Sequence, residues 1–338
     1  MHKPILIVAE ALDDAAVSRG QPIAGARYGL LRSLLDQAGI AFADCAITTV
    51  FQQHVRDIRE LCAVRNDKAN YIPDYRPIEP GRYIHARYAE DITQLYRMLD
   101  YTKPNVTICL GPAGLWALAK KAGLKKFRGS PLYDHTNRWK LLPTWSPEQI
   151  QRQWSLRPIA ISDLAKAKDQ STSPTFTRPR REIWIEPSIA DIRHFYEAYI
   201  IPAESVSCDI ETAAGTITEV GYAPSPDRAI VIPFYSRRQP DGNYWRTAAE
   251  EREAWSIIAE INRTKPLFGQ NFQYDMQYFW RAMGIPCPGF CDDTMLLHHS
   301  LQPEMEKGLG FLGSIYTREA GWKFMRHDNA EHYKQGED

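Results

Sequence analysis

Short apolar stretches alternate with segments of helical periodicity in the first half of the chain, and this alternation restricts the fold more than any other feature. Four stretches have the length and apolar character of buried strands, at residues 4–10, 45–50, 105–111 and 140–145. Residues 27–39 and 112–123 have helical spacing. Strands that alternate with helices predict βαβ units and a parallel sheet.

A polar segment ends this pattern, and a second set of elements follows it. Residues 166–181 hold two prolines and few apolar side chains, which is typical of a linker. Beyond it we expect strands at 181–186, 205–211, 215–223, 228–235 and 266–270, and helices at 189–200, 248–263, 271–284, 293–300 and 308–316. A chain of 338 residues is long enough for two domains. We place them at 1–155 and 182–338, joined by a linker over 156–181.

The charge balance excludes a chain that attracts nucleic acid through its overall field. Lys plus Arg and Asp plus Glu both number 41, so any such partner has to be held by local basic patches. The sequence shows neither a membrane span nor a signal peptide, and its six cysteines are scattered, which predicts a cytoplasmic protein. Cys287 and Cys291 form the only close pair, and we expect structural thiols there, not a zinc site.

Two carboxylates follow a β-prone run in "SVSCDIETAAG", residues 205–215. Asp209 and Glu211 are two positions apart, so on a strand both project from the same face. Taken alone, such a pair is more often a solvated strand end. Like charges placed side by side nevertheless favour a cation between them.

Further carboxylates in the second half strengthen this interpretation. Asp275 follows Asn271 by four residues, on one face of a predicted helix, and "CDDTM" adds Asp292 and Asp293. Three or more converging carboxylates suit hard cations such as Mg²⁺ or Mn²⁺. A pair of such ions promotes in-line displacement at phosphorus. The spacing therefore predicts a two-metal hydrolytic site.

At this point the sequence resembles a known family. "CDIET", "FGQNFQYD" and "DDTMLLHHSLQPEMEKGLGFLGSIYT" are similar to the 3′→5′ proofreading exonuclease domain of A-family DNA polymerases, the phage members above all, over about 180–338. The resemblance implies a ribonuclease-H-like mixed-sheet fold and two-metal hydrolysis of single-stranded or primer-template DNA. It implies metal binding by Asp209, Glu211 and Asp275, with Thr212 and Asn271 at the substrate. Residues 296–316 would be packing helices of that fold, with His298 and His299 partly buried.

The chain departs from the family at its last motif. The family completes its site with Tyr-x-x-x-Asp, whose Asp is the fourth metal ligand. Tyr333 and Asp338 are one residue too far apart for this motif, and we do not assign them the role. No polymerase domain follows, so we expect either a piece of a longer polymerase or a shortened product, in the bacterial host cytoplasm if it is phage-encoded. Exonuclease activity would then depend on how the site is completed.

The first half resembles the uracil-DNA glycosylase superfamily over about residues 1–150. The similar motifs are "AEALD", "RGQPIAG", "CAITTVF", "CLGPAGLWALAKKAGLKKFRGS" and "LLPTWSPEQI". The resemblance implies an α/β/α sandwich with a parallel sheet and a base-sized pocket at the strand ends. Glu10 keeps the position that handles water or a cation.

Three working positions of that superfamily are altered. Ile23 replaces the stacking aromatic residue, Thr49 the amide that reads the base edge, and Ser146 the histidine that stabilises the departing base. The cysteine spacing of an iron–sulfur cluster is missing, so no such cluster is expected. We therefore predict that uracil excision is lost. Two alternatives remain. The domain binds DNA or a partner protein, or its pocket accepts a modified phage base.

A basic cluster is the best candidate for DNA contact. "KKAGLKKFRG" carries five cations without an acidic residue: Lys120, Lys121, Lys125, Lys126 and Arg128. Such a cluster can bind phosphates without sequence preference, but it can equally be a solvated helix end. The linker adds Lys166, Lys168, Arg178, Arg180 and Arg181. We expect a DNA replication module whose partners are DNA and a further replication protein.

Overall fold

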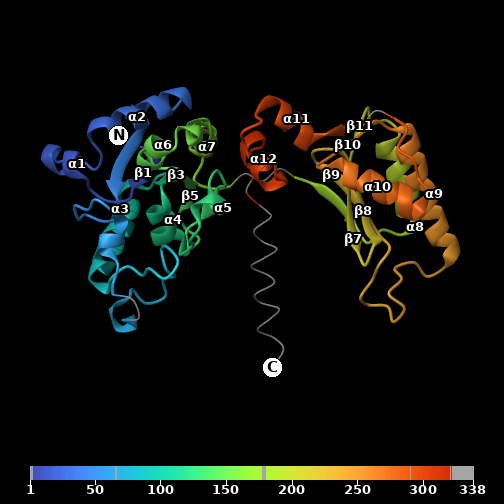
Figure 1. The fold of residues 1–338 in the computed structure, drawn as a ribbon, viewed down its shortest axis with the longest axis horizontal. Coiled ribbons are helices and arrows are strands. Elements are labelled where there is room, and N and C mark those ends of the chain that lie inside the picture. The colour runs from blue at the N-terminus through green and yellow to red at the C-terminus, as the bar shows by residue number, and fades with distance from the viewer. Residues whose placement is uncertain (1–2, 65–66, 177–179, 290, 320, 322–338) are drawn as a thin grey trace. The chain divides into compact units, whose positions relative to one another are not determined.

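The chain is an α/β protein with two mixed sheets in a computed structural model that describes residues 3–64, 67–176, 180–289, 291–319 and 321 (Figure 1). It divides into two compact units. Unit 1 comprises Met1–Thr177 together with Gly310–Asp338, and unit 2 comprises Arg178–Leu309. Among the described residues, no helix combines the length and apolar character needed to span a bilayer.

The sheet of unit 1 has the strand order β2-β1-β3-β5-β4. Its strands are β1 (Ile5–Ala9), β2 (Cys45–Thr49), β3 (Val106–Leu110), β4 (Leu132–Tyr133) and β5 (Lys140–Thr144). The first four in this order are parallel, as predicted, but β4 runs antiparallel to β5. The expectation of a purely parallel sheet is therefore wrong at this edge. The turn into β5 is closed by Asp134, which accepts hydrogen bonds from the backbone N–H groups of Arg138 and Trp139.

Helices cover both faces of this sheet. They are α1 (Asp14–Arg19), α2 (Gly25–Gln37), α3 (Ala89–Thr102), α4 (Pro112–Ala119), α5 (Leu124–Phe127), α6 (Pro147–Arg152) and α7 (Arg157–Gln170), with 3₁₀ turns at Phe42–Asp44, Ile58–Leu61, Lys68–Asn70, Ala86–Tyr88 and Trp154–Leu156. Alternate residues of β1 enter different cores. Leu6 belongs to the same hydrophobic core as Trp116 of α4, whereas Ile7 belongs to the core that contains Leu31 of α2. This alternation creates three layers, helix, sheet and helix.

Helix α7 lies in the segment that the sequence analysis places in the linker. The expected linker begins at 156, yet residues 157–170 are helical, and Ala160, Leu164 and Ala167 are buried in the core. The error has a physical cause, because α7 also buries the charged side chains of Asp163 and Lys166. Charged residues at core positions conceal an amphipathic pattern.

The sheet of unit 2 has the strand order β11-β10-β7-β8-β9-β6. Its strands are β6 (Glu182–Ile185), β7 (Val206–Ala213), β8 (Thr216–Ser225), β9 (Arg228–Pro233), β10 (Leu267–Gly269) and β11 (Cys291–Asp293). Strands β7, β8 and β9 are antiparallel, whereas β10 and β11 continue parallel to β7. The expected mixed sheet is confirmed. Strand β7, which carries the first two predicted site residues, lies inside the sheet.

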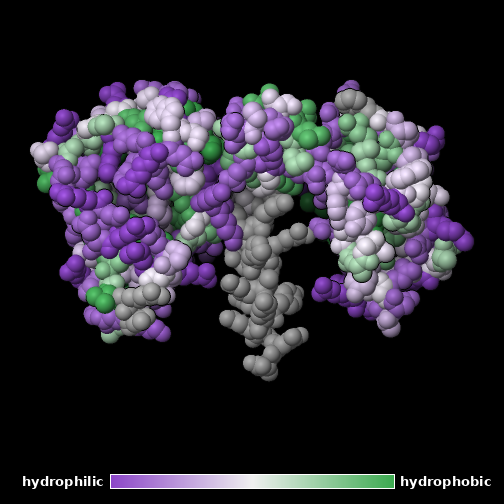
Figure 2. Space-filling model, in the orientation of Figure 1, coloured by the Kyte–Doolittle hydropathy of each residue, from purple (hydrophilic) through white to green (hydrophobic). Residues whose placement is uncertain are grey.

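The later helices are α8 (Ile189–Phe195), which continues as a π-helical turn over Tyr196–Ile200, α9 (Ala248–Thr264), α10 (Phe272–Met283), α11 (Thr294–Leu301) and α12 (Leu309–Tyr316). In α11, His298 is buried and His299 is exposed. Helix α12 was expected to pack within the second domain, but from Gly310 onward it groups with unit 1. Hydrophilic side chains cover much of the visible surface of both units (Figure 2).

Candidate functional site

Asp209 and Glu211 project from one face of β7, as their spacing predicts. Both side chains are exposed, whereas the alternate residues Val206, Cys208 and Ile210 are buried. The alternation follows from the two-residue period of a strand. The buried face is anchored in the core of unit 2, so the two carboxylates are held on a fixed support.

Asp275 reaches this strand from the first turn of α10. Strand β10 pairs only Leu267 and Phe268 with β7, so the edge of β7 beyond Ser207 is open. The backbone N–H of Ile210 donates to Asp275 Oδ1 at 2.9 Å and thereby fills this gap. A carboxylate that is 4% exposed is thus fixed directly against the strand that carries the other two.

The connection from β10 to α10 requires unusual backbone positions. A Cβ atom on Gly269 would lie 2.8 Å from the carbonyl oxygen of Cys208, so only glycine allows this close approach. Asn271 has a φ of 58°, in the left-handed region that Asn tolerates better than most residues. Asn271 therefore precedes the helix. The expectation that it shares a helix face with Asp275 is wrong, because the helix begins at Phe272.

Asp293 stabilises the ends of two helices. Its carboxylate accepts hydrogen bonds from the backbone N–H groups of Asn271 at 3.0 Å, Phe272 at 2.8 Å and Met295 at 2.8 Å. These N–H groups lie at the starts of α10 and α11, where intrahelical partners are lacking. Asp293, predicted to join the carboxylate cluster, instead positions the helix that carries Asp275.

Burial makes Asp275 hard to ionise. Desolvation raises the pKa of its carboxyl group to about 6, and the negative charges of Asp209 and Asp293 add to this effect. The hydrogen bond from Ile210 opposes it. The carboxyl groups of Asp275 and Asp209 are thus close enough for the charge of Asp209 to act on Asp275.

The donor types suit a hard divalent cation, but their side chains do not converge on one point. Within the described parts of the chain, no three His, Cys, Asp or Glu side chains are grouped so that they could hold a metal ion. Asp209 and Glu211 nevertheless lie on one face of β7, and Asp275 is bonded to the backbone of the same strand at Ile210. All three supply the carboxylate oxygens that Mg²⁺ and Mn²⁺ prefer. The residues fit these ions in donor chemistry.

Tyrosines border this edge, and the sequence analysis did not single them out. The hydroxyl groups of Thr212 and Tyr274 form a hydrogen bond at 2.8 Å. The ring centroids of Tyr274 and Tyr278 are 4.8 Å apart, and Tyr274 is 43% exposed. The signal was present as two aromatic residues four positions apart beside Asp275.

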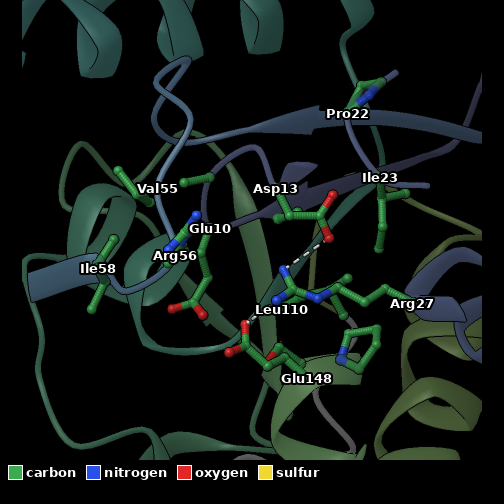
Figure 3. A pocket seen from close by; sticks show the side chains of 14 residues that line it. Glu10, Asp13, Pro22, Ile23, Arg27, Val55, Arg56, Ile58, Leu110 and Glu148 are labelled. Carbon is green, nitrogen blue, oxygen red and sulfur yellow. Dashed lines mark ion pairs between the residues drawn. The ribbon is translucent and has the colours of Figure 1, made fainter. Parts of the chain in front are cut away.

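Unit 1 contains a cavity of about 60 Å³ at the carboxyl ends of β1 and β3 (Figure 3). Glu10 lines it and accepts a hydrogen bond from the backbone N–H of Ala113 at 3.2 Å. Gly111 makes room for this side chain, since a Cβ atom there would lie 2.7 Å from Glu10 Cδ. Burial raises the pKa of Glu10 to about 7. Arg27 stands nearby, ion-paired with Asp13 and Glu148.

The three residues expected to differ from the glycosylase pattern have local structural roles. Ser146 caps α6, accepting from the N–H of Gln149, and Thr49 Oγ1 accepts from the side chain of Gln52. Ile23 is buried in the cavity wall. These contacts explain why a small hydroxyl or aliphatic side chain fits at each place.

The structure divides the predicted basic cluster. Lys125 and Lys126 are exposed, and Lys120 and Lys121 are half-buried. Arg128 is 4% exposed and ion-paired with Asp163 at 2.5 Å, so its assignment to a DNA-contacting surface is wrong. Among the linker cations, Lys166 is likewise buried, whereas Lys168, Arg180 and Arg181 are exposed. Arg178, Tyr333 and Asp338 lie outside the described residues.

The chain is distantly similar in structure to known nucleases. No family model matches the sequence, and no curated protein does. The Aedes aegypti Nibbler EXO domain is 14% identical, with a TM-score of 0.34, over 46% of this chain and 78% of that one. Escherichia coli RNase D, an exoribonuclease involved in structured RNA processing, is 17% identical (TM-score 0.32) over 43% and 35%. Brucella melitensis NrnC with bound Mg²⁺ is 17% identical (TM-score 0.25) over 40% and 59%.

Proposed function

We propose that the chain is a 3′→5′ exonuclease module that hydrolyses single-stranded DNA ends with Mg²⁺ or Mn²⁺. One observation carries this proposal. The hydrogen bond from Ile210 N–H to Asp275 fixes a buried carboxylate against the strand that bears Asp209 and Glu211. The mixed sheet of unit 2 agrees with the ribonuclease-H-like fold that the sequence resemblance implies.

Asp209, Glu211 and Asp275 would hold the cations. Bound divalent ions would supply the Lewis-acid chemistry that phosphodiester hydrolysis requires. The chain itself contributes positioning, because Asp293 fixes the start of α10 and Ile210 orients Asp275. Thr212, joined to Tyr274, and Asn271 at the helix start would border the DNA end.

Unit 1 would hold DNA or a replication partner while unit 2 carries the chemistry. The exposed Lys125 and Lys126 and the half-buried Lys120 and Lys121 support such a contact with phosphates. In this proposal the chain is the N-terminal part of a phage-type A-family DNA polymerase and works in the cytoplasm.

The direct test is degradation of a 5′-labelled single-stranded oligonucleotide with Mg²⁺, Mn²⁺ or EDTA. We expect a metal-dependent ladder that Asp209→Ala abolishes. Asp227→Ala is the control, because Asp227 belongs to the exposed turn between β8 and β9. Absence of a ladder in the unaltered protein with both Mg²⁺ and Mn²⁺ would reject the proposal.

A second candidate is base excision by unit 1 with a modified base as substrate. It is favoured by one observation, the Glu10 carboxyl group with a pKa of about 7 beside the cavity. A group with this pKa is suited to proton transfer at neutral pH. Release of a free modified base from DNA, lost in Glu10→Gln and kept in Asp209→Ala, would support it. No release from any modified duplex tested would reject it.

A further inference from the structure

Three charged side chains are buried together where α7 meets the loop after α5. Arg128, Asp163 and Lys166 are 4%, 0% and 2% exposed. Asp163 accepts hydrogen bonds from Arg128 Nε at 3.0 Å and Nη2 at 2.5 Å, and from Thr144 Oγ1 at 2.8 Å. One carboxylate thus faces two cations. Because buried charge is costly without partners, this group requires further acceptors.

Helix α12 provides these acceptors. Lys166 Nζ donates to the carbonyl oxygen of Ser314 at 2.5 Å and to that of Gly129 at 3.2 Å. Arg128 Nη1 donates to Ser314 Oγ at 2.9 Å, and Ser162 Oγ donates to the carbonyl oxygen of Ile315 at 3.2 Å. Ser314 and Ile315 lie in the last turn of α12, where carbonyl groups lack intrahelical partners and the helix dipole is negative. The positive charge of Arg128 and Lys166 therefore lies at the C-terminal end of α12, where the negative end of the helix dipole stabilises it.

The residues after α12 extend the contact along unit 1. Arg318 pairs with Asp169 of α7 at 2.9 Å. The backbone N–H of Gly321 donates to Ser130 Oγ at 2.5 Å. Closer to the start of α12, the guanidinium group of Arg128 lies 5.6 Å from the ring centroid of Phe311. The contact thus includes Phe311 in the first turn of α12 as well as Arg318 and Gly321 beyond it.

Gly129 shows that the backbone is shaped for this arrangement. Its φ is 66°, and a Cβ atom there would lie 2.2 Å from Asp163 Oδ1 and 3.5 Å from the carbonyl oxygen of Ser314. Any side chain at this position would displace the carboxylate that orients Arg128. Glycine is therefore required both by the conformation and by the space.

We propose that unit 1 carries a receptor site for the C-terminal end of a helix, formed by Arg128, Ser162 and Lys166, and that its partner is α12 of the same chain. An isolated helix of eight residues is not stable in water, so α12 depends on this docking for its structure. The site anchors the chain where it returns from unit 2. This inference does not depend on the proposed nuclease activity.

A matching anchor holds the chain where it leaves unit 1. The buried Lys140 donates through Nζ to the carbonyl oxygens of Ser173 at 2.6 Å and Thr175 at 3.3 Å. Asn105 Nδ2 donates to the carbonyl oxygen of Ser171 at 2.7 Å. Where the chain leaves unit 1, the buried ammonium group of Lys140 binds backbone carbonyl groups, and where the chain returns, that of Lys166 does so. Unit 1 therefore binds its own two segments that lead to and from unit 2.

Hydrogen exchange of the full-length chain tests the receptor site. In the unaltered protein, the amides of residues 311–317 should exchange slowly. In Lys166→Met they should exchange at least about tenfold faster, while β1 and β3 keep their protection. Lys168→Met, two residues along α7 at an exposed position, is the control and should change nothing. Ser162→Ala, a smaller change, should give an intermediate increase and serves if Lys166→Met fails to fold.

Two exchange results would overturn the inference. One is rapid exchange of 311–317 in the unaltered protein, since α12 would then not be docked. The other is unchanged protection of 311–317 in both Ser162→Ala and folded Lys166→Met. A third measurement concerns the partner, because α12 of a second copy could fill the same site. A monomer mass in solution at all concentrations, with α12 protected, supports docking within one chain, and protection that appears only with dimers contradicts it.

Discussion

At the scale of single residues, Asp275 is a buried carboxyl group that lies beside a second carboxylate. Its carboxyl group is desolvated and faces Asp209, and it is held by the N–H of Ile210. Its pKa of about 6 lies above the ordinary value, so the folded state binds this proton more tightly than the unfolded state does. Stability associated with Asp275 is therefore greatest at acid pH and is lost as the pH rises from about 4 to 6.

Asp275→Asn should separate stability from activity. Because Asn keeps a carbonyl oxygen for the Ile210 N–H and carries no charge, we expect unit 2 to be more stable than the unaltered protein at pH 8, by on the order of 1 kcal/mol. Exonuclease activity should fall at least about a hundredfold. Hydrogen exchange of β7 amides at pH 5 and pH 8 measures the first effect. Equal stability of the two proteins at pH 8 would contradict the electrostatic account.

The buried carboxyl group of Glu10 leads to a corresponding prediction for the stability of unit 1 as a function of pH. With a pKa raised to about 7, its contribution to stability should decline as the pH rises from about 4.5 to 7. Glu10→Gln should flatten this dependence, measured as exchange of β1 amides at pH 5 and pH 8. Asp36→Asn, exposed on α2, is the control. An unaltered pH dependence in Glu10→Gln would show that its carboxyl group is not desolvated in solution.

At the scale of elements, the helix starts at Asp293 determine the geometry of the candidate site. Asp293→Ala removes acceptors from three backbone N–H groups at α10 and α11. We expect a loss of about 1–3 kcal/mol in the stability of unit 2 and a reduced nuclease rate, because Asp275 is no longer positioned. Asp227→Ala, in the exposed turn between β8 and β9, is the control. Urea unfolding followed by hydrogen exchange of α10 measures the difference.

Elements with a clear period were predictable, and those that depend on distant partners were not. The amphipathic pattern of α9 and the spacing of Asp209 and Glu211 are local properties, and the structure shows both. Helix α7 escaped prediction because Asp163 and Lys166 are buried against Arg128 and Ser314, which come from other parts of the chain. The strand β4 has two residues, too few for a pattern.

The candidate site shows the same limit. The pair on β7 follows from strand geometry, but the place of Asp275 depends on where β10 stops. The left-handed Asn271 and the capping by Asp293 depend on how β11 and α10 meet. Carboxylates that are alike in sequence thus divide into those that face the site and one that supports a helix.

At the scale of the whole molecule, zero net charge means that the DNA affinity of the proposed function would have to come from local cations. Lys125 and Lys126 are exposed on α5, and in the proposed function they bind the phosphate backbone. Each phosphate contact to single-stranded DNA contributes about 0.7 to the slope of log affinity against log salt. Loss of both contacts should therefore lower the slope by about 1.4.

The variant Lys125→Gln/Lys126→Gln tests this distribution of roles between the units. We expect weaker binding of an oligonucleotide and a smaller salt slope, but an unchanged cleavage rate at saturating DNA, because the carboxylates lie in unit 2. Arg19→Gln/Arg97→Gln removes the same charge from exposed positions of unit 1 and is the control. If both variants lower the slope equally, the contact is a general field effect. If neither does, DNA is held by unit 2 alone, and the surface lysines of α5 serve only solvation.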